Sequence, residues 1–511
     1  MTVTRKASAR THRPLDYDVI VIGTGLGGSA AAVSLAHAGR KVLVLEKNKR
    51  IGGSCSYYER KGFHVDLGTH LFCRAEKGPL GDVLRRVGFP DAVRFKRAIP
   101  GRVVGYDLNF EVPDTVLKAP LAMLLGLYQG QVPLRELPGI LRLFQKMLLM
   151  GERDIEALDR VSIHDFITRY TKNPHLYILF NFLLGLYFIL PPYEVSAGEA
   201  VWCFQRYIKD HAMSYPEGGS VAIPEAYLRI ACRYGATVRT RARVKRILMA
   251  EGRAHGVETS TGEVYRAPVV ISTAGLRDAV RMLGEEYFSP EFVQRISTLK
   301  GSQIAVQAKI GLRRPVTKAA WVVGGAPLRF PRGQPTLEYF SDQYNHVLEG
   351  RLGQMTPIYC PIPTFFDPSL APEGCQLLTA CALAPTTDIE LQDAESRWID
   401  SMMDALYQMI PGLRDADPIF CDTMGVRFIE SWIGKSGGAA VTTGQAVGQV
   451  GADRPGVRSE IPGLYFAGDC AGGRGVGTEL AAASGMECAD AVLADDLVSS
   501  GRRSPPAGVR A

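Results

Sequence analysis

Hydrophobic residues near the start of the chain follow a strand, loop and helix pattern. Residues 19–22 are an unbroken β-branched run, and residues 29–38 are rich in alanine. Such a run is typical of a strand buried on both faces of a parallel sheet, whereas alanine favours helix. A glycine-rich stretch, residues 23–28, separates the two, and a second apolar run follows at residues 41–45. The pattern predicts a βαβ unit.

The glycine-rich stretch has the spacing of a dinucleotide-binding loop. Gly23 allows a tight turn, Gly25 lets the backbone approach a pyrophosphate, and Gly28 lets the helix pack closely on the strand. Amide N–H groups at the helix N-terminus would face the anion, and Leu26 of the loop is a further predicted cofactor-binding residue. An ordinary βαβ turn that binds nothing is the alternative.

Residues after the second apolar run favour one class of dinucleotide. Glu46 lies about 20 residues beyond the loop, where a carboxylate can accept hydrogen bonds from the adenosine ribose hydroxyls and would repel a 2′-phosphate. Gly52 and Gly53 form a second loop that a nicotinamide-binding unit does not normally carry. We therefore predict FAD, with Lys47 and Ser54 in the same site.

A second strand, loop and helix pattern lies near the end of the chain. An apolar run at residues 461–467 leads into Gly468 and Asp469, then into a glycine loop and an alanine-rich helix. Asp469 is suited to hydrogen-bond the ribityl chain of a flavin. The helix N-terminus near Gly477 and Thr478 could face flavin N1 and the C2 carbonyl, where its partial positive charge favours reduced, anionic flavin. Both ends of the chain thus converge on one FAD.

Further short motifs resemble a known family. They are Gly52-Gly53-Ser54, Tyr57-Tyr58-Glu59-Arg60 followed by Asp66-x-Gly68, and Tyr215-Pro216-Glu217-Gly218-Gly219. They resemble motifs of the phytoene desaturase and carotenoid isomerase flavoproteins, especially the isomerase branch, within the flavin amine oxidase superfamily. With the loops, they cover about 15–100, 213–275 and 440–495. The resemblance implies that Val244 lies near the adenine.

The last glycine loop departs from the family pattern. The family often has Pro-Gly-x-Gly, whereas this chain has Gly472-Gly473-Arg474-Gly475, followed by Glu479. Arg474 and Glu479 are therefore candidate catalytic residues that could reach the flavin ring or the substrate. Solvent exposure or a mutual ion pair is the alternative for both.

The expected fold class is α/β, with a Rossmann-type FAD-binding domain and a discontinuous α+β substrate domain. The substrate domain should combine an antiparallel sheet, with strands near residues 304–310 and 376–384, and apolar helices. The predicted FAD-binding parts are 17–112, 213–300 and 425–496; the substrate parts are 113–212 and 301–424; and the tails 1–16 and 497–511 should be disordered.

Residues 113–150 are strongly apolar and end in a predicted amphipathic helix. Apolar positions at Ile140, Leu141, Phe144, Met147 and Leu148 repeat with helical spacing, with basic residues between them. This helix could face the core, or lie on a membrane surface where an apolar substrate enters. Residues 176–190 are too few to span a bilayer. The expected location is cytoplasmic, with peripheral association at the inner membrane face as an option.

Composition excludes several other classes. The net charge of +7, from 59 basic and 52 acidic residues, is too small at 511 residues to argue for nucleic-acid binding. Ten cysteines lack any CxxC pair, which is typical of free thiols in a reducing compartment. His64, Asp66 and His70 do not have the spacing of a standard metal site, so no metal is expected.

The predicted function is hydride transfer between flavin N5 and a carbon of an apolar isoprenoid or polyene, giving desaturation, double-bond reduction or isomerisation. The electron acceptor and oligomeric state are left open. One alternative is an amine-oxidase-type enzyme with a polar, aromatic-flanked pocket. Another is a non-catalytic prenyl-binding relative, similar to the GDP-dissociation inhibitors, which would have lost flavin binding.

Overall fold

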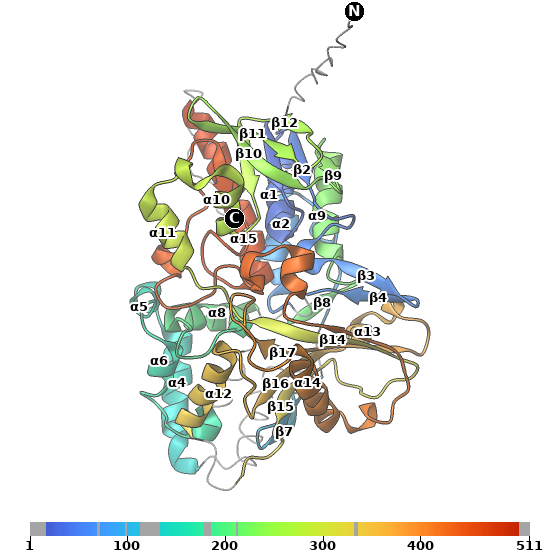
Figure 1. Cartoon of the computed structure of the whole chain (residues 1–511). Helices are drawn as coiled ribbons and strands as arrows, with labels where there is room; N and C mark the ends of the chain where they lie inside the picture. Colours follow the sequence, from blue (N-terminus) through green and yellow to red (C-terminus); the bar gives the residue numbers. More distant parts are fainter. Residues whose placement is uncertain are drawn as a thin grey trace, which may run out of the picture.

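The structure is a computed structural model that describes residues 17–68, 72–97, 100–112, 133–177, 185, 187–210, 213–331 and 336–499. Its two largest sheets form two bodies, one above the other in Figure 1. The upper body carries helices α1, α9 and α15, and the lower body carries α14. The two predicted tails and residues 113–132 lie outside the described ranges.

The upper body contains a five-stranded parallel sheet in the order β19-β13-β1-β2-β9. Its strands come from distant parts of the chain because each parallel pairing needs a crossover. They are β1 (Val19–Ile22), β2 (Val42–Leu45), β9 (Thr237–Arg239), β13 (Val269–Ser272) and β19 (Leu464–Phe466). All residues of β1, β2 and β13 are buried, as the unbroken apolar runs predicted.

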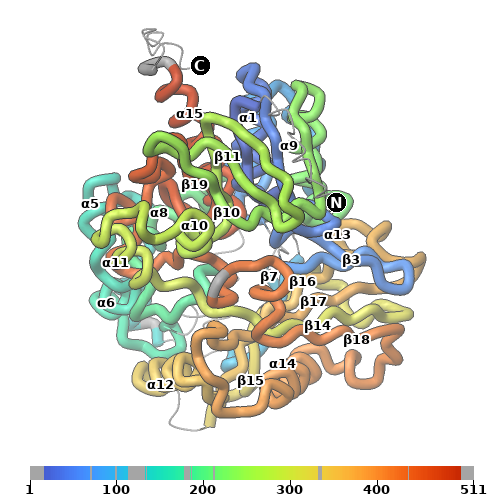
Figure 2. The backbone as a smooth tube through the Cα atoms, turned by 45° about the horizontal axis from the view of Figure 1, so that its top comes forward, coloured from blue at the N-terminus to red at the C-terminus, as the bar shows by residue number. Residues whose placement is uncertain are grey.

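Helices from both ends of the chain cover this sheet together. Helix α1 (Leu26–His37) packs against α15 (Gly477–Ser499) and α9 (Ala222–Arg233). The tube in Figure 2 shows the blue α1 beside the green α9. A side chain at Gly485 in α15 would overlap the Gly27 carbonyl oxygen and Ala30 of α1. Glycine there permits the close contact between the two helices.

The lower body is a seven-stranded sheet in the order β18-β14-β17-β16-β15-β6-β7. Every pairing is antiparallel except the one between β15 and β6. The strands are β6 (Gly101–Gly105), β7 (Leu108–Val112), β14 (Ile304–Leu312), β15 (Trp321–Ala326), β16 (Thr356–Pro361), β17 (Gln376–Ala384) and β18 (Pro418–Met424). One face packs on α14 (Glu395–Met409) through alternating residues such as Ile304, Val306 and Ala308.

The strands at one edge of this sheet belong to a different domain from the one predicted. Residues 101–112 were assigned to the FAD-binding part 17–112, but they form β6 and β7 of the seven-stranded sheet. Their partner, β15, lies more than 200 residues later in the chain. Local alternation of apolar and polar residues shows that a strand forms, but it cannot show which sheet the strand joins.

Three smaller sheets complete the described strands. The three-stranded sheet is β10 (Val244–Ala250), β11 (Arg253–Thr259) and β12 (Val264–Arg266), and β3 (Tyr57–Arg60) forms a hairpin with β4 (Phe63–Asp66). Strand β5 (Phe95–Arg97) pairs with β8 (Ser214–Pro216). The remaining α-helices are α2 (Pro79–Arg86), α4 (Leu137–Leu149), α5 (Glu152–Ala157), α6 (Ile163–Ile167), α8 (Ala197–Asp210), α10 (Leu276–Leu283), α11 (Pro290–Thr298), α12 (Leu337–Leu348) and α13 (Pro363–Phe366).

The predicted amphipathic helix is α4, and it buries a different set of residues from the one expected. Ile140, Leu143 and Met147 are buried, and the helix packs against α8. Leu141 and Leu148, expected on the apolar face, are 67% and 44% exposed. Within the described ranges, no helix is both long enough and apolar enough to cross a membrane.

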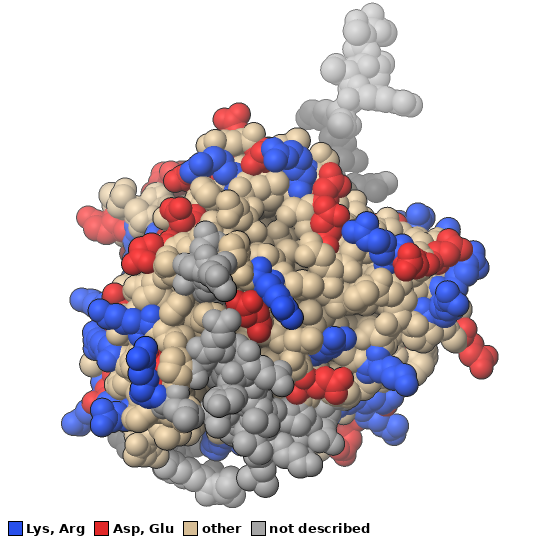
Figure 3. All heavy atoms as spheres, turned by 90° about the horizontal axis from the view of Figure 1, so that it is seen from below, with Lys and Arg blue, Asp and Glu red and all other residues tan. Residues whose placement is uncertain are grey.

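Surface charge follows the modest net charge of the chain. On the described part of the face seen in Figure 3, basic side chains lie among acidic ones. A nucleic-acid-binding surface would instead gather its basic residues in one patch or stripe. This face therefore lacks the charge arrangement that such a surface needs.

Candidate functional site

A cavity of about 810 Å³ lies between the two bodies. Its upper wall includes the first glycine loop, the Gly52-Gly53 loop and the start of α15, and its lower wall is a face of the seven-stranded sheet. Of the sixteen residues predicted for cofactor binding or catalysis, all except Gly28 and Arg474 line this cavity. Residues from distant parts of the chain therefore meet in one space.

The first glycine loop has the geometry of an anion-binding loop. Gly23 has φ +103°, a conformation that favours glycine, and a side chain at Gly28 would overlap the Gly23 carbonyl oxygen. A Cβ at Gly25 would meet no atom of the described residues within 4 Å, so packing against them does not explain this glycine. No side chain caps the N-terminus of α1, which begins at Leu26. These features fit the pyrophosphate of a dinucleotide.

Glu46 is buried at the end of β2 and holds the first loop in place. Its carboxylate accepts hydrogen bonds from Thr24 N (3.1 Å), from Thr24 Oγ1 and from Asn48 N (2.9 Å). Thr24 Oγ1 also accepts a hydrogen bond from Gly52 N at 3.1 Å. Glu46, which is predicted to bind the ribose, therefore also links the two glycine loops through Thr24.

The second loop and the start of β10 complete the nucleotide end of the cavity. Gly52 and Gly53 both have positive φ, and a Cβ at Gly53 would lie 3.2 Å from Gly25 Cα. Lys47, Ser54 and Val244 also line the cavity. The two glycine loops thus approach each other closely and both line the cavity, where their backbone groups can contact a nucleotide.

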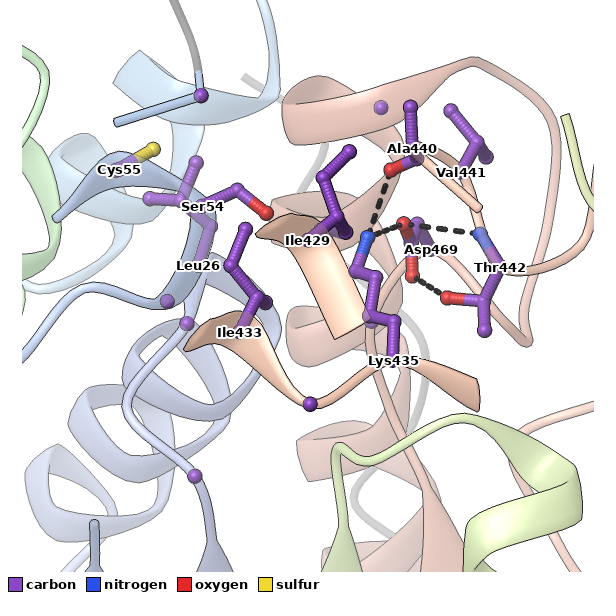
Figure 4. A pocket seen from close by; sticks show the side chains of 18 of the residues that line it. Leu26, Ser54, Cys55, Ile429, Ile433, Lys435, Ala440, Val441, Thr442 and Asp469 are labelled. Carbon is purple, nitrogen blue, oxygen red and sulfur yellow. Dashed lines mark hydrogen bonds and ion pairs between the residues drawn. The ribbon is translucent and has the colours of Figure 1, made fainter. Parts of the chain in front are cut away.

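Asp469 lines the cavity on the C-terminal side and is held by two residues that the sequence analysis missed. Figure 4 shows its carboxylate accepting hydrogen bonds from Thr442 and forming an ion pair with Lys435, with 2.6 Å between Lys435 Nζ and Asp469 Oδ2. Although burial opposes ionisation, Lys435 and Thr442 hold the pKa of Asp469 below its ordinary value. The carboxylate is therefore charged at neutral pH, ready to accept hydrogen bonds from ligand hydroxyls.

Lys435 belongs to a segment that borders the cavity. The segment includes the short π-helix Ile429–Ile433, and Ile429, Ile433 and Lys435 line the wall in Figure 4. Glycines at 434, 437, 438 and 444 surround Lys435 in the sequence. This glycine-rich stretch was a signal of close backbone approach that the sequence analysis did not use.

The other end of the cavity is lined mainly by apolar and aromatic side chains. Register places Gln307, Cys381, Tyr359 and Val323 in one row across β14, β17, β16 and β15, and all four line the cavity. The opposite wall contributes Tyr187, Ile189, Met213 and Val476. This end suits an apolar ligand. Phe180 and Phe182, which belong to the apolar run 176–190, lie outside the described residues.

Glu479 is a buried carboxyl at this apolar end. It lies in the first turn of α15, lines the cavity and accepts a hydrogen bond from Arg74 N at 2.7 Å. Burial raises its pKa to about 7, although the backbone N–H groups of Arg74 and Cys73 oppose the rise. Glu479 can therefore hold or release a proton near neutral pH.

Arg474 lies outside the cavity wall, in contrast to the prediction that it reaches the flavin ring or substrate. Its guanidinium pairs with both carboxylate oxygens of Asp159 (2.9 and 2.6 Å) and with Glu199 (3.0 Å). Glu199 also accepts a hydrogen bond from Gly475 N. Two buried carboxylates need a counter-charge, and Arg474 supplies it. We infer that Arg474 positions the loop before α15 and does not pair with Glu479.

No metal site is evident in the described part of the chain. No group of three or more His, Cys, Asp or Glu side chains is arranged there to hold a metal ion. His64 stacks on Tyr57 and lies 3.6 Å from Asp66, while His70 is outside the described residues. Asp66 instead accepts hydrogen bonds from Tyr215 and Ser220.

The combination of two glycine loops, Glu46 and Asp469 fits a flavin dinucleotide. A flavin would supply hydride transfer, while the chain would bind it, orient the substrate and exclude water. A family model described as flavin containing amine oxidoreductase matches residues 26–493. The chain belongs to this family of flavin-containing oxidoreductases.

Individual relatives are distant. The chain is 26% identical to a chloroplastic prolycopene isomerase of an Oncidium hybrid cultivar, over 94% of this chain and 84% of that protein. It is 29% identical to all-trans-retinol 13,14-reductase of Danio rerio, over 56% of this chain and 51% of that one. A solved oxidoreductase of Methanosarcina mazei aligns with TM-score 0.69 at 20% identity, covering 93% of this chain and 100% of that chain. The solved structure supports the fold alone.

We predict that Glu479 makes stability depend on pH. Its pKa is about 7 in the folded state against an ordinary 4.5, so the folded state binds the extra proton between these values and stability falls as pH rises through this window. Glu479→Gln is uncharged throughout and keeps an oxygen for Arg74 N. The unfolding free energy of Glu479→Gln should exceed that of the wild-type protein by an amount that grows from near zero at pH 4.5 to about 3 kcal/mol above pH 7.

Chemical denaturation across pH measures this difference. The matched control is Glu487→Gln, since Glu487 is exposed on the same helix. A difference in unfolding free energy between Glu479→Gln and the wild-type protein that stays constant with pH would contradict a raised pKa for Glu479.

Proposed function

We propose that the protein binds FAD and transfers hydride between the flavin and a carbon of an apolar isoprenoid or polyene. The observation that carries the proposal is the single cavity that continues from the two glycine loops to the apolar row on the seven-stranded sheet. A dinucleotide held at the loops would place its far end beside this row. Cofactor and apolar substrate would then share one water-poor space.

Two features favour FAD over a smaller flavin. Glu46 and the first glycine loop lie at the end of the cavity away from the apolar row, and they suit an adenosine diphosphate group. Asp469, which lines the same cavity, suits the hydroxyls of a ribityl chain. A flavin without the adenosine half would leave the Glu46 end of the cavity without a ligand.

The substrate class is supported by the cavity wall and by the names of relatives. The wall near Tyr359 and Val323 offers apolar contacts, which suit a hydrocarbon chain. The relatives are named for prolycopene and all-trans-retinol, both polyenes. We extend this class to the present chain as a proposal, without choosing between desaturation, reduction and isomerisation.

Glu479 is the residue to which we assign proton transfer. In a desaturation, the substrate loses a hydride from one carbon and a proton from its neighbour, and a double bond forms between them. Glu479 would accept that proton as a carboxylate, and in a reduction it would donate a proton as the neutral acid. A pKa of about 7 allows both protonation states at physiological pH.

The test is anaerobic flavin reduction with a panel of carotenoids, retinoids, polyprenyl compounds and soluble amines. We expect the purified protein to be yellow and at least one apolar compound to bleach the oxidised flavin or to reoxidise the reduced flavin. Glu479→Gln should slow this step by about 10²–10⁴-fold, the range for general acid–base catalysis. Bleaching by amines alone, with peroxide formed in air, would favour the amine-oxidase alternative. A colourless protein would favour the non-catalytic one.

A separate prediction concerns FAD retention. Glu46→Arg removes the acceptor for Thr24 and Asn48 and adds charge at a buried site, so the dissociation constant for FAD should rise at least tenfold, roughly the cost of losing hydrogen bonds to a charged group. Equilibrium dialysis and identification of the released flavin measure this. The control is Glu59→Arg, the same charge change at an exposed position. Release of FMN, or full FAD occupancy in Glu46→Arg, would refute the assignment.

We also propose that α4 binds the surface of an anionic membrane. Leu141, Leu148 and Leu149 are exposed, and the exposed Arg142 and Lys146 lie on the same helix. Exposed leucines can insert into the interface, while the basic residues attract anionic headgroups. An apolar substrate could then pass from the bilayer to the protein.

Sedimentation with anionic liposomes tests the membrane prediction. Binding should be strong at low salt and partly lost at high salt, because screening removes the electrostatic part. Replacing Leu141 and Leu149 by serine should weaken partition at least about tenfold, because less apolar surface is buried. The control replaces Val264 and Val447, exposed elsewhere, by serine. Equal binding of the two double variants would return α4 to a purely structural role.

A further inference from the structure

The apolar row on the seven-stranded sheet contains one amide. Gln307 of β14 lies opposite Cys381 of β17 and Met424 of β18, and Cys381 lies opposite Tyr359 of β16. Gln307 lines the cavity and is 3% exposed. Alternation along β14 turns Val306 and Ala308 towards α14, so Gln307 and Ala305 belong to the cavity face.

The buried amide lacks a complete set of hydrogen bonds. Gln307 Oε1 is inaccessible to solvent and has no hydrogen-bond partner among the described residues. Its neighbours in the row, Cys381 and Met424, offer at most weak sulfur groups. A buried polar group without a partner is costly, and buried amides are normally paired. Gln307 Nε2 is not among the inaccessible, unpartnered atoms, so this end of the amide can face the cavity and take a partner from a ligand there.

The chemistry of an amide restricts what that ligand can be. The terminal torsion of glutamine is soft, so a half turn presents either its oxygen, an acceptor, or its NH₂ group, a donor. A hydroxyl both donates and accepts, and it matches either orientation. A hydrocarbon chain matches neither and would leave the amide unpaired.

We propose that Gln307 binds a hydroxyl group of the substrate, so that the site selects an isoprenoid or polyene alcohol over the hydrocarbon with the same carbon skeleton. This inference rests on the proposed function, because it names the substrate class of the same cavity. The apolar neighbours Tyr359 and Val323 bind the hydrocarbon part, and Gln307 sets the position of the hydroxyl. Glu479 remains the residue for proton transfer.

Binding to the FAD-loaded protein tests the inference without requiring turnover. A polyprenyl alcohol and its deoxygenated hydrocarbon, presented in the same detergent, are compared by equilibrium dialysis. The wild-type protein should bind the alcohol about tenfold more tightly, the effect of one buried hydrogen bond. Gln307→Met, similar in size and apolar, should lose most of this preference while binding the hydrocarbon at least as tightly as the wild-type protein does, because no amide is then left unpaired.

The control variant is Gln303→Met. Gln303 is equally buried just before β14 and also has unpartnered amide atoms, but it does not line the cavity. Its substitution should leave the preference for the alcohol unchanged.

Three results would overturn the inference. They are equal binding of alcohol and hydrocarbon by the wild-type protein, a preference retained in Gln307→Met, or a Gln307→Met protein that loses FAD or changes its flavin spectrum without ligand. The wild-type comparison needs no variant to fold. Flavin redox changes, measured separately, distinguish the two proposals. A preference for the alcohol, with no apolar compound either bleaching the oxidised flavin or reoxidising the reduced flavin, would refute hydride transfer and leave the hydroxyl site supported.

Discussion

Close approach of backbone to backbone at three glycine segments is the constraint on which the rest of the structure depends. A Cβ at Gly27 would lie 2.6 Å from backbone atoms of Gly468, and one at Gly53 would lie 3.2 Å from Gly25 Cα. The N-terminal loop, the second loop and the C-terminal segment therefore touch without intervening side chains. Gly25, in contrast, borders open space. Because these segments lack side chains, their backbones can touch and their N–H groups stay available to a ligand. Residues from both ends of the chain therefore line one cavity.

Buried carboxylates around the cavity differ in protonation because their partners differ. Asp469 has an ammonium partner, Lys435, which keeps its pKa low. Glu479 receives backbone N–H groups while burial dominates, so its pKa rises to about 7. Burial also raises the pKa of Glu199, although Gly475 N–H and Arg474 oppose the rise. The carboxylate beside the nucleotide end is thus suited to accept hydrogen bonds as an anion, whereas the carboxyl at the apolar end can exchange a proton.

The two bodies contribute different parts of the function. The parallel sheet and its helices carry the residues expected to hold the flavin, and this part is typical of the flavin containing amine oxidoreductase family to which the chain belongs. The seven-stranded sheet supplies the wall that a substrate would contact. Alternation of side chains along β14 lets one strand serve two purposes, because Val306 and Ala308 join the core beneath α14 while Ala305 and Gln307 face the cavity. A change on the cavity face can therefore alter ligand choice while leaving the core intact.

Local pattern in the sequence determined the strand, loop and helix at residues 19–37, the antiparallel strands β14 and β17, and the placement of Glu46 and Asp469 at the ends of strands. These features follow from periodicity, glycine conformation and strand ends, which neighbouring residues decide. Only the tertiary structure decided the partners of Arg474, which are Asp159 and Glu199, 315 and 275 residues away in sequence. It also placed residues 101–112 in the seven-stranded sheet and Lys435 against Asp469. Periodicity shows which face of an element is apolar. Which charged residue or strand contacts that element depends on how distant segments pack.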